Sequence, residues 1–240
     1  MENLKVIHLA ETDSTNRWLR EHPEDGDVVV WTDYQSAGRG CGTNTWESER
    51  GQNLLFSMLY HPDRLPAAQQ FRISMAVALA LRDELTRQGL ADVTIKWPND
   101  IYWRDSKLAG ILIENQLHGA FLQSSIIGVG LNVNQEVFLS DAPNPVSMRQ
   151  IADRRFDRES LLRGVVDAME HRLKTAADLS DQYQQALYRR AGVYPYCDKD
   201  GRFEAVLVGV KPDGRLVLRD TDGRVRAYAF KEVTFCLGTT

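Results

Sequence analysis

The chain has 240 residues, 43% hydrophobic and 26% charged, with a formal net charge of −4; this is typical of a soluble globular protein and lacks the excess of Lys and Arg that nucleic-acid binding needs. No apolar run approaches the roughly 20 residues of a membrane-spanning helix, and the N-terminus lacks the basic start and apolar core of a signal peptide, so we expect a cytoplasmic protein without membrane or nucleic-acid partners. Three scattered cysteines without paired spacing argue against a disulfide framework or a zinc site.

The first quarter of the chain alternates short strands with polar segments. Residues 4–9 predict a strand, and residues 12–16 are suited to capping a helix that continues through Leu19. Residues 27–32 (DVVVWT) predict a buried strand, because β-branched residues favour extended structure. The segment 35–52 is polar and rich in glycine. A loop of this length inside a compact domain is uncommon and is usually functional or disordered.

The middle of the chain predicts a long helix between strands. Residues 53–60 resume strand character, and a helix is expected from Pro66 to about Gln88, where Gly89 ends it. Turn-forming residues separate three further predicted strands, at 93–96, 107–115 and 121–132.

The sequence pattern of the chain changes at Val193. Before it, residues 141–145 predict a loop and residues 158–190 a helical region. After it, short β-rich segments alternate with turns, which indicates a small barrel. We therefore predict two domains, residues 1–192 and 193–240. The strands cluster without strict alternation with helices, so the first domain is expected to be α+β.

The segment 35–46 (QSAGRGCGTNTW) is the first candidate site. Its glycines let the backbone approach a ligand and present N–H groups to anions. The guanidinium of Arg39 is suited to gripping carboxylate or phosphate oxygens. It is not a Walker-type phosphate loop, because no Gly-Lys-Ser/Thr follows at the required spacing. A mobile surface loop with one solvated arginine is the alternative interpretation.

Two lysine-containing segments are the next candidates. In residues 96–100 (KWPND), Pro98 fixes the backbone beside an amide and a carboxylate; an ordinary β-turn is the alternative. In residues 107–114 (KLAGILIE), Lys107 opens an apolar strand. Burying a lysine is costly unless it is paired, so the alternative is a lysine exposed at a strand end.

A glycine-rich strand completes the candidates. Residues 128–134 (GVGLNVN) place two glycines and two asparagines in a β-rich run. Glycine in a strand interior can mark close approach by a ligand or another backbone. A bulge followed by a turn is the alternative.

Taken together, these segments resemble the biotin–protein ligases. STN at 14–16, Q-x-A-G-R-G with a downstream Trp46, KWPND, KLAGIL and GxGxNVN occur here in the order found in that family. The similarity spans residues 12–133, and Asn144-Pro145 with the C-terminal segment fits the same plan. The resemblance implies a mixed β-sheet catalytic domain, similar to the class II synthetases, with helices packed on it and an SH3-like C-terminal barrel.

The resemblance also implies roles for the charged residues. Arg39 and Lys107 would lie near the biotin carboxylate and the α-phosphate of ATP, and Lys96 would face phosphate. Asp100 would hold Mg²⁺ or orient Lys107. Positioned cations of this kind lower the barrier when the biotin carboxylate attacks the α-phosphate and pyrophosphate leaves.

The remaining implied residues bind the two substrates, biotin and ATP. Those expected on the biotin side are Ser14, Thr15, Gln35, Gly38, Gly110 and Leu112, and Gly40 is expected to bind substrate without being assigned to either end. Those expected at the ATP end are Trp46, Asn53, Asn99 and Asn132. The adenylate would then be attacked by a lysine of a biotin carboxyl carrier protein. A homodimer is also compatible with the family, in which many members dimerise.

Two other functions stay open at this point. A lipoate–protein ligase shares the adenylate chemistry, although KWPND and KLAGIL favour biotin. A non-catalytic module that senses biotin or a nucleotide belongs to a different class, and the retention of Arg39, Lys96, Asp100 and Lys107 argues against it.

The chain departs from the family pattern at the glycine loop. The family often reads G-R-G-R-x-G-R-x-W, whereas Cys41, Thr43 and Asn44 stand here at its second arginine, second glycine and third arginine. The loop therefore has fewer cations to hold an adenylate. No helix-turn-helix segment precedes the motifs, so repressor activity is not expected. The C-terminal segment lacks site-like residues, and we expect packing or acceptor docking from it.

Overall fold

The structure is a computed structural model that describes residues 4–42, 44–139, 144–175 and 177–236. Thr43 and residues 141–143 of the predicted loop lie outside the described residues. In the part of the chain that is described, none of the helices combines the length and the apolar composition that a membrane crossing demands.

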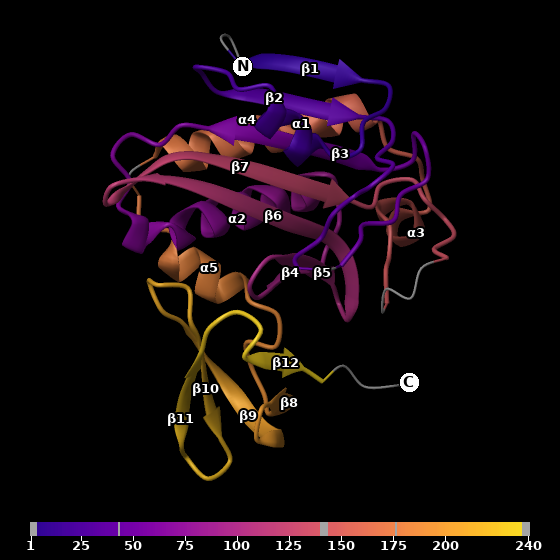
Figure 1. Cartoon of the computed structure of the whole chain (residues 1–240). Helices are drawn as coiled ribbons and strands as arrows, with labels where there is room; N and C mark the ends of the chain where they lie inside the picture. The colour runs from indigo at the N-terminus through magenta and orange to yellow at the C-terminus, as the bar shows by residue number, and fades with distance from the viewer. Residues whose placement is uncertain (1–3, 43, 140–143, 176, 237–240) are drawn as a thin grey trace.

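Seven strands form the larger of two sheets (Figure 1). They are β1 (Lys5–Leu9), β2 (Val28–Thr32), β3 (Leu54–Tyr60), β4 (Val93–Lys96), β5 (Asp100–Trp103), β6 (Ser106–His118) and β7 (Phe121–Leu131). Their order is β1-β2-β3-β7-β6-β5-β4. The β1–β2 pair is parallel and the other neighbouring pairs are antiparallel. The predicted α+β class with a mixed sheet is confirmed.

Helices cover both faces of this sheet. They are α1 (Thr15–Glu21), α2 (Phe71–Arg87), α3 (Met148–Ala152), α4 (Arg158–Lys174) and α5 (Ser180–Ala186), with a short 3₁₀ helix η1 (Ala67–Gln69) before α2. Leu54, Phe56 and Met58 of β3 belong to the core shared with α2 and α4, whereas Leu59 packs with Leu19 of α1. Because side chains alternate faces along a strand, α1 lies on the face opposite α2 and α4.

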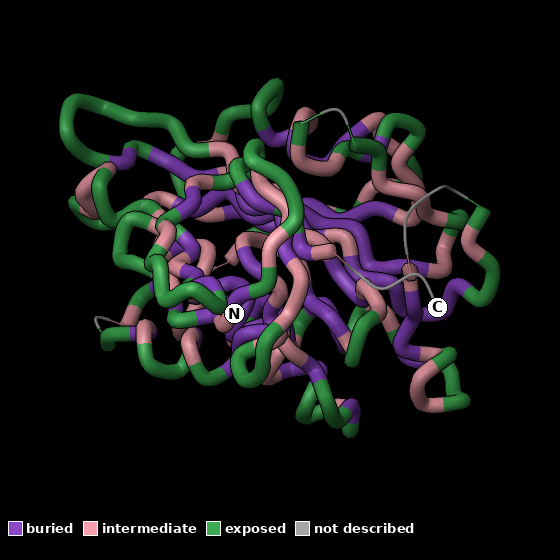
Figure 2. The backbone as a smooth tube through the Cα atoms, turned by 90° about the horizontal axis from the view of Figure 1, so that it is seen from below, coloured by how far each residue is buried: buried purple, intermediate pink, exposed green. Residues whose placement is uncertain are grey.

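Because helices cover both faces of the sheet, the central strands are buried on both sides. Every residue of β3 is buried, and the buried strands run through the middle of the molecule with exposed loops around them (Figure 2). Burial of each large apolar side chain contributes about 1.5–3 kcal/mol. The apolar sequences of β2 and β3 are what a strand needs when neither of its faces meets water.

The C-terminal strands form a second, antiparallel sheet. They are β8 (Tyr194–Asp198), β9 (Gly201–Val210), β10 (Leu216–Asp220), β11 (Val225–Tyr228) and β12 (Val233–Phe235), in the order β11-β10-β9-β8-β12. Among the described residues the two edge strands, β11 and β12, do not pair with each other. The structure therefore shows a five-stranded sheet where a barrel was expected.

The two sheets share contacts. Trp97 Nε1 donates to the Gly214 carbonyl at 2.8 Å, and Gln184 of α5 exchanges hydrogen bonds with the backbone of Val210. Side chains of both sheets belong to one buried core cluster. The boundary at residues 192 and 193 stays a prediction.

Three local predictions differ from the structure. The helical region 158–190 is two helices, because Thr175 is extended and Asp178 accepts a hydrogen bond from the N–H of Ser180, the first residue of α5. The helix expected from Pro66 begins at α2 instead, after η1. Helix α3 was not predicted, although a capping box of Ser147 and Gln150 marks its start.

Candidate active site

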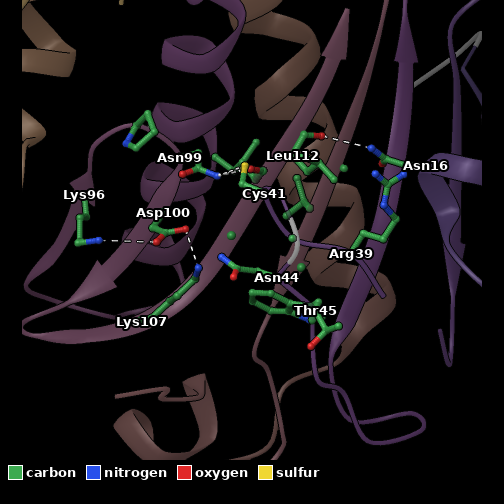
Figure 3. A pocket seen from close by; sticks show the side chains of 18 of the residues that line it. Asn16, Arg39, Cys41, Asn44, Thr45, Lys96, Asn99, Asp100, Lys107 and Leu112 are labelled. Atoms are coloured by element: carbon green, nitrogen blue, oxygen red, sulfur yellow. Dashed lines mark hydrogen bonds and ion pairs between the residues drawn. The ribbon is translucent and has the colours of Figure 1, made fainter. Parts of the chain in front are cut away.

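A cavity of about 370 Å³ lies on the α1 face of the large sheet. Its walls come from the start of α1, the segment 35–46, the β4–β5 turn, strands β6 and β7, and the chain from Phe230 to Phe235. Segments from both ends of the sequence therefore meet around one space. Figure 3 shows its side chains.

The glycine loop folds back on itself as a hairpin. Arg39 and Thr45 form an antiparallel β-bridge through their backbones. The Gly40 N–H donates to the Asn44 carbonyl at 2.8 Å, and the Trp46 N–H donates to the Gly38 carbonyl at 3.0 Å. These bonds hold the described part of the loop over the sheet. The alternative of a purely mobile surface loop is not what the structure shows.

The Trp46 indole lies on two paired glycines. Gly110 of β6 and Gly130 of β7 are opposite each other in the ladder. A Cβ added at Gly130 would lie 2.8 Å from Trp46 Cδ2 and Cζ2, and one at Gly110 would lie 3.0 Å from Cζ3. The glycines in these strands therefore mark close approach of a side chain. The indole N–H is buried and has no hydrogen-bond partner among the described residues.

One carboxylate and two lysines form a charged cluster at one end of the cavity. Asp100, the first residue of β5, lies 2.7 Å from Lys107 Nζ and 4.0 Å from Lys96 Nζ (Figure 3). Only 18% of the Lys96 side chain is exposed. Burial lowers the pKa of Lys96, and the nearby Asp100 charge opposes that shift. Lys107 is thus a paired lysine facing the cavity.

Asn99 connects the lysine cluster to the glycine loop. Its Nδ2 donates to the Ile111 carbonyl at 2.7 Å and lies 3.1 Å from Cys41 Sγ. Burial raises the pKa of the Cys41 thiol, and the Asp100 carboxylate raises it further. Cys41 therefore faces the cavity as a neutral thiol.

The opposite end of the cavity is polar but neutral at its base. Gln35 Oε1 accepts from the Thr15 N–H at 2.8 Å and from its hydroxyl at 3.1 Å. The Ser57 hydroxyl lies 2.6 Å from both Thr15 Oγ1 and Asn16 Oδ1. Ser14 is buried beside them. Arg39 points toward this end, with Nη1 3.8 Å from a carboxylate oxygen of Glu114.

This arrangement suits a ligand with two different ends. Buried hydroxyl and amide groups at one end can bind a neutral polar ring by hydrogen bonds, and the lysine cluster at the other end can bind anionic groups. Gly110 and Gly130, with the Trp46 indole lying on them, line the cavity between the two ends.

Comparison with known proteins identifies the family. A model described as the biotin/lipoate A/B protein ligase family matches residues 6–132, which is more than half of the chain. The chain belongs to this family. It is 32% identical over 238 residues to the biotin–[acetyl-CoA-carboxylase] ligase of Paracoccus denitrificans, covering 90% of this chain and 95% of that protein. It is 31% identical to the bifunctional ligase/repressor BirA of Salmonella typhimurium, covering 98% of this chain and 75% of that protein.

Solved structures of biotin protein ligases have the same fold. The ligase of Aquifex aeolicus in complex with biotin and ATP matches with a TM-score of 0.79 and 23% identity, over 96% of this chain and 97% of that one. At this identity the likeness shows the fold alone.

Most residues that the sequence singled out in this ligase-family chain line the cavity. They are Ser14, Thr15, Gln35, Arg39, Gly40, Trp46, Lys96, Asn99, Asp100, Lys107, Gly110 and Leu112. Their contacts with substrates stay predictions.

Three predicted residues lie outside the cavity lining and have structural contacts. Asn53 Oδ1 accepts from the Val133 N–H at 2.9 Å, and Asn132 Nδ2 donates to the Val146 carbonyl at 3.1 Å. Gly38 lies so close to the Trp46 carbonyl that an added Cβ would be 2.7 Å from it. Each holds part of the wall, and a direct role in ATP or biotin binding stays a prediction.

Sequence reasoning missed two groups of lining residues. The first is local: Asn16, Thr45 and Gly128 lie within the predicted motifs but were given no role of their own. The second is the C-terminal group Phe230, Lys231, Val233, Thr234 and Phe235. The expectation that the C-terminal segment lacks site residues is therefore wrong for the cavity wall. No local pattern signals it, because these residues reach the cavity only through packing of the second sheet.

Proposed function

We propose that the chain is a biotin–protein ligase, which activates biotin with ATP to biotinyl-5′-AMP and transfers biotin to a lysine of a biotin carboxyl carrier protein. The observation that carries the proposal is the Lys107–Asp100–Lys96 cluster facing a neutral, hydrogen-bonding pocket across one cavity. Membership of the family, and relatives named as biotin ligases, support it.

The first step joins two anions. An oxygen of the biotin carboxylate forms a bond to the α-phosphorus of ATP, and the bond from that phosphorus to pyrophosphate breaks. Lys107 is placed to offset the charge that gathers there, because Asp100 holds its Nζ at 2.7 Å. The Lys96 side chain is largely buried, so few water molecules solvate its ammonium group. An arriving phosphate would therefore stabilise this charge.

The residues fit Mg²⁺ only as a companion of ATP. Asp100 is the one carboxylate lining the described cavity, and the described residues contain no cluster of three or more potential metal-binding side chains. Mg²⁺ commonly binds through one or two carboxylates together with substrate phosphates. Asp100 would hold such an ion, which neutralises phosphate charge when bound.

The second step consumes the adenylate. The neutral amine of the acceptor lysine attacks the carbonyl carbon of the mixed anhydride, an amide forms, and AMP leaves with the bonding electrons. The amine proton is lost to solvent or a base. Lys107 stays beside the reacting carboxyl group and stabilises the negative charge on its oxygen.

The neutral pocket favours biotin over lipoate. Ser14, Thr15 and Asn16 are buried polar residues that line the cavity. A ureido ring has N–H donors and a carbonyl acceptor to satisfy such groups, whereas the dithiolane ring of lipoate has neither. A site built for hydrogen bonding discriminates strongly against an analogue that lacks them.

The test is ATP-dependent transfer of biotin to an isolated carrier domain, together with biotin-dependent pyrophosphate exchange. Biotin should support both reactions and lipoate neither. Lys107→Ala and Arg39→Ala should each lower exchange about tenfold or more, which corresponds to about 1.4 kcal/mol in the barrier. Arg163→Ala is a matched control, because Arg163 is an exposed arginine of α4 paired with Glu159. Exchange with lipoate alone, or near-normal exchange in both site variants, would contradict the proposal.

A further inference from the structure

The turn between β11 and β12 reaches the glycine loop. Phe230 and Lys231 line the cavity, and the Lys231 ammonium lies against Gly42, where an added Cβ would be 2.5 Å from Nζ. Gly42 also has a φ of +72°. The positive φ favours a glycine at this position, and the absence of a Cβ leaves room for the end of the Lys231 side chain.

Local bonds hold Lys231 at the tip of this turn. The Glu232 N–H donates to the Ala229 carbonyl at 3.1 Å, and a Glu232 carboxylate oxygen accepts from the Ala229 N–H at 2.7 Å. The carboxylate next to Lys231 is thus engaged with the backbone. The Lys231 Nζ lies 5.7 Å from the centre of the Phe230 ring.

Lys231 differs from the other cations of the cavity in having no carboxylate partner in the part of the chain that the structure describes. Lys96 and Lys107 lie near Asp100, and Arg39 lies near Glu114. Within the described ranges, Lys231 makes no ion pair. Its charge is therefore available to an anion that enters the cavity.

Lys231 lies beside a glycine loop that has fewer positive charges than the family pattern. Cys41 and Asn44 stand where the family often has arginine, so the described part of the loop contributes one cation, Arg39, and that cation points to the neutral end. Lys231 brings a positive charge to the same loop from the second sheet.

We propose that Lys231 is a phosphate-binding residue, which holds the phosphates of ATP and then the phosphate of the adenylate against the glycine loop. This deepens the proposed function and rests on it for the adenylate. It assigns part of the nucleotide site to the C-terminal sheet.

The first experiment measures ATP binding by calorimetry, with Mg²⁺ and without biotin. Lys231→Ala should weaken binding about tenfold, whereas Lys231→Arg should retain most of it. Lys199→Ala is the control, because Lys199 is an exposed lysine on the β8–β9 turn of the same sheet, outside the cavity lining. Thermal unfolding of each variant checks that the fold is retained.

The outcomes separate this inference from the proposed function. Equal ATP affinity in Lys231→Ala and Lys199→Ala, or an equal loss in Lys231→Arg, overturns the role of Lys231 even if the protein ligates biotin. Weakened ATP binding in Lys231→Ala supports it even if biotin is not the substrate, since biotin is absent from this measurement.

The second experiment measures how long the adenylate stays bound. The wild-type protein and Lys231→Ala are loaded with ATP and biotin, desalted without acceptor, and followed for release. Lys231→Ala should release the adenylate about tenfold faster, and Cys41→Arg in that background should restore retention by returning a cation to the loop. Equal release from wild type and Lys231→Ala would exclude the adenylate part of the proposal.

Discussion

Gly130→Ala tests whether the Trp46 ring depends on the glycines beneath it. Carbon atoms in contact lie about 3.5–4.0 Å apart, whereas the new methyl group would lie 2.8 Å from two ring carbons. Strand β7 is paired on both sides, with β3 and β6, so its backbone has little freedom to retreat. The ring must therefore shift by about 1 Å, and overpacking of this kind costs about 1–3 kcal/mol.

A double-mutant cycle isolates that clash. Urea unfolding is measured for the wild type, Gly130→Ala, Trp46→Ala and the double variant. The cost of Gly130→Ala should disappear in the Trp46→Ala background, which gives a coupling energy of about 1–3 kcal/mol. Pyrophosphate exchange should also fall in Gly130→Ala, because the displaced indole enters the space between the two ends of the cavity.

Two controls calibrate the measurement. Gly110→Ala should cost less, because its methyl group would meet the ring at 3.0 Å. Gly26→Ala should be near neutral, because nothing lies within 4 Å of the added Cβ and the backbone there is outside the left-handed region. If Gly130→Ala destabilises equally with and without the Trp46 side chain, the ring does not rest on Gly130 and the reasoning is wrong.

Two further predictions concern the charges of the cavity. Burial lowers the pKa of Lys96, so pyrophosphate exchange that needs its positive charge should be lost as the pH rises through a value below the pKa of an ordinary lysine. Arginine stays protonated, so Lys96→Arg should shift this alkaline loss of activity to higher pH. An unchanged pH profile would show that another group titrates. Cys41→Arg should lengthen the lifetime of the bound adenylate, because Cys41 faces the cavity and arginine makes charge-assisted hydrogen bonds to phosphate. Equal rates of adenylate dissociation from the wild type and Cys41→Arg would refute this prediction.

The sequence by itself determined the lysine cluster, because its parts are close along the chain. Lys96 and Asp100 flank a turn, and the following hairpin pairs Asp100 with Gly110, which brings Lys107 beside the carboxylate. Strand and turn residues predicted the strands at 93–96 and 107–115, whereas β5 between them was not predicted. The α+β class and the apolar central strands follow from local patterns, whereas the mixed sheet was expected from the family resemblance.

Only the tertiary structure decided what surrounds this cluster. Trp46 lies on Gly110 and Gly130 because the glycine loop folds across two strands that come much later in the chain. The Lys231 ammonium reaches Gly42 only after the second sheet has packed against Trp97 and α5. Local propensity carries no information on such contacts, because they are selected by the burial of whole faces and by the bonds between the two sheets.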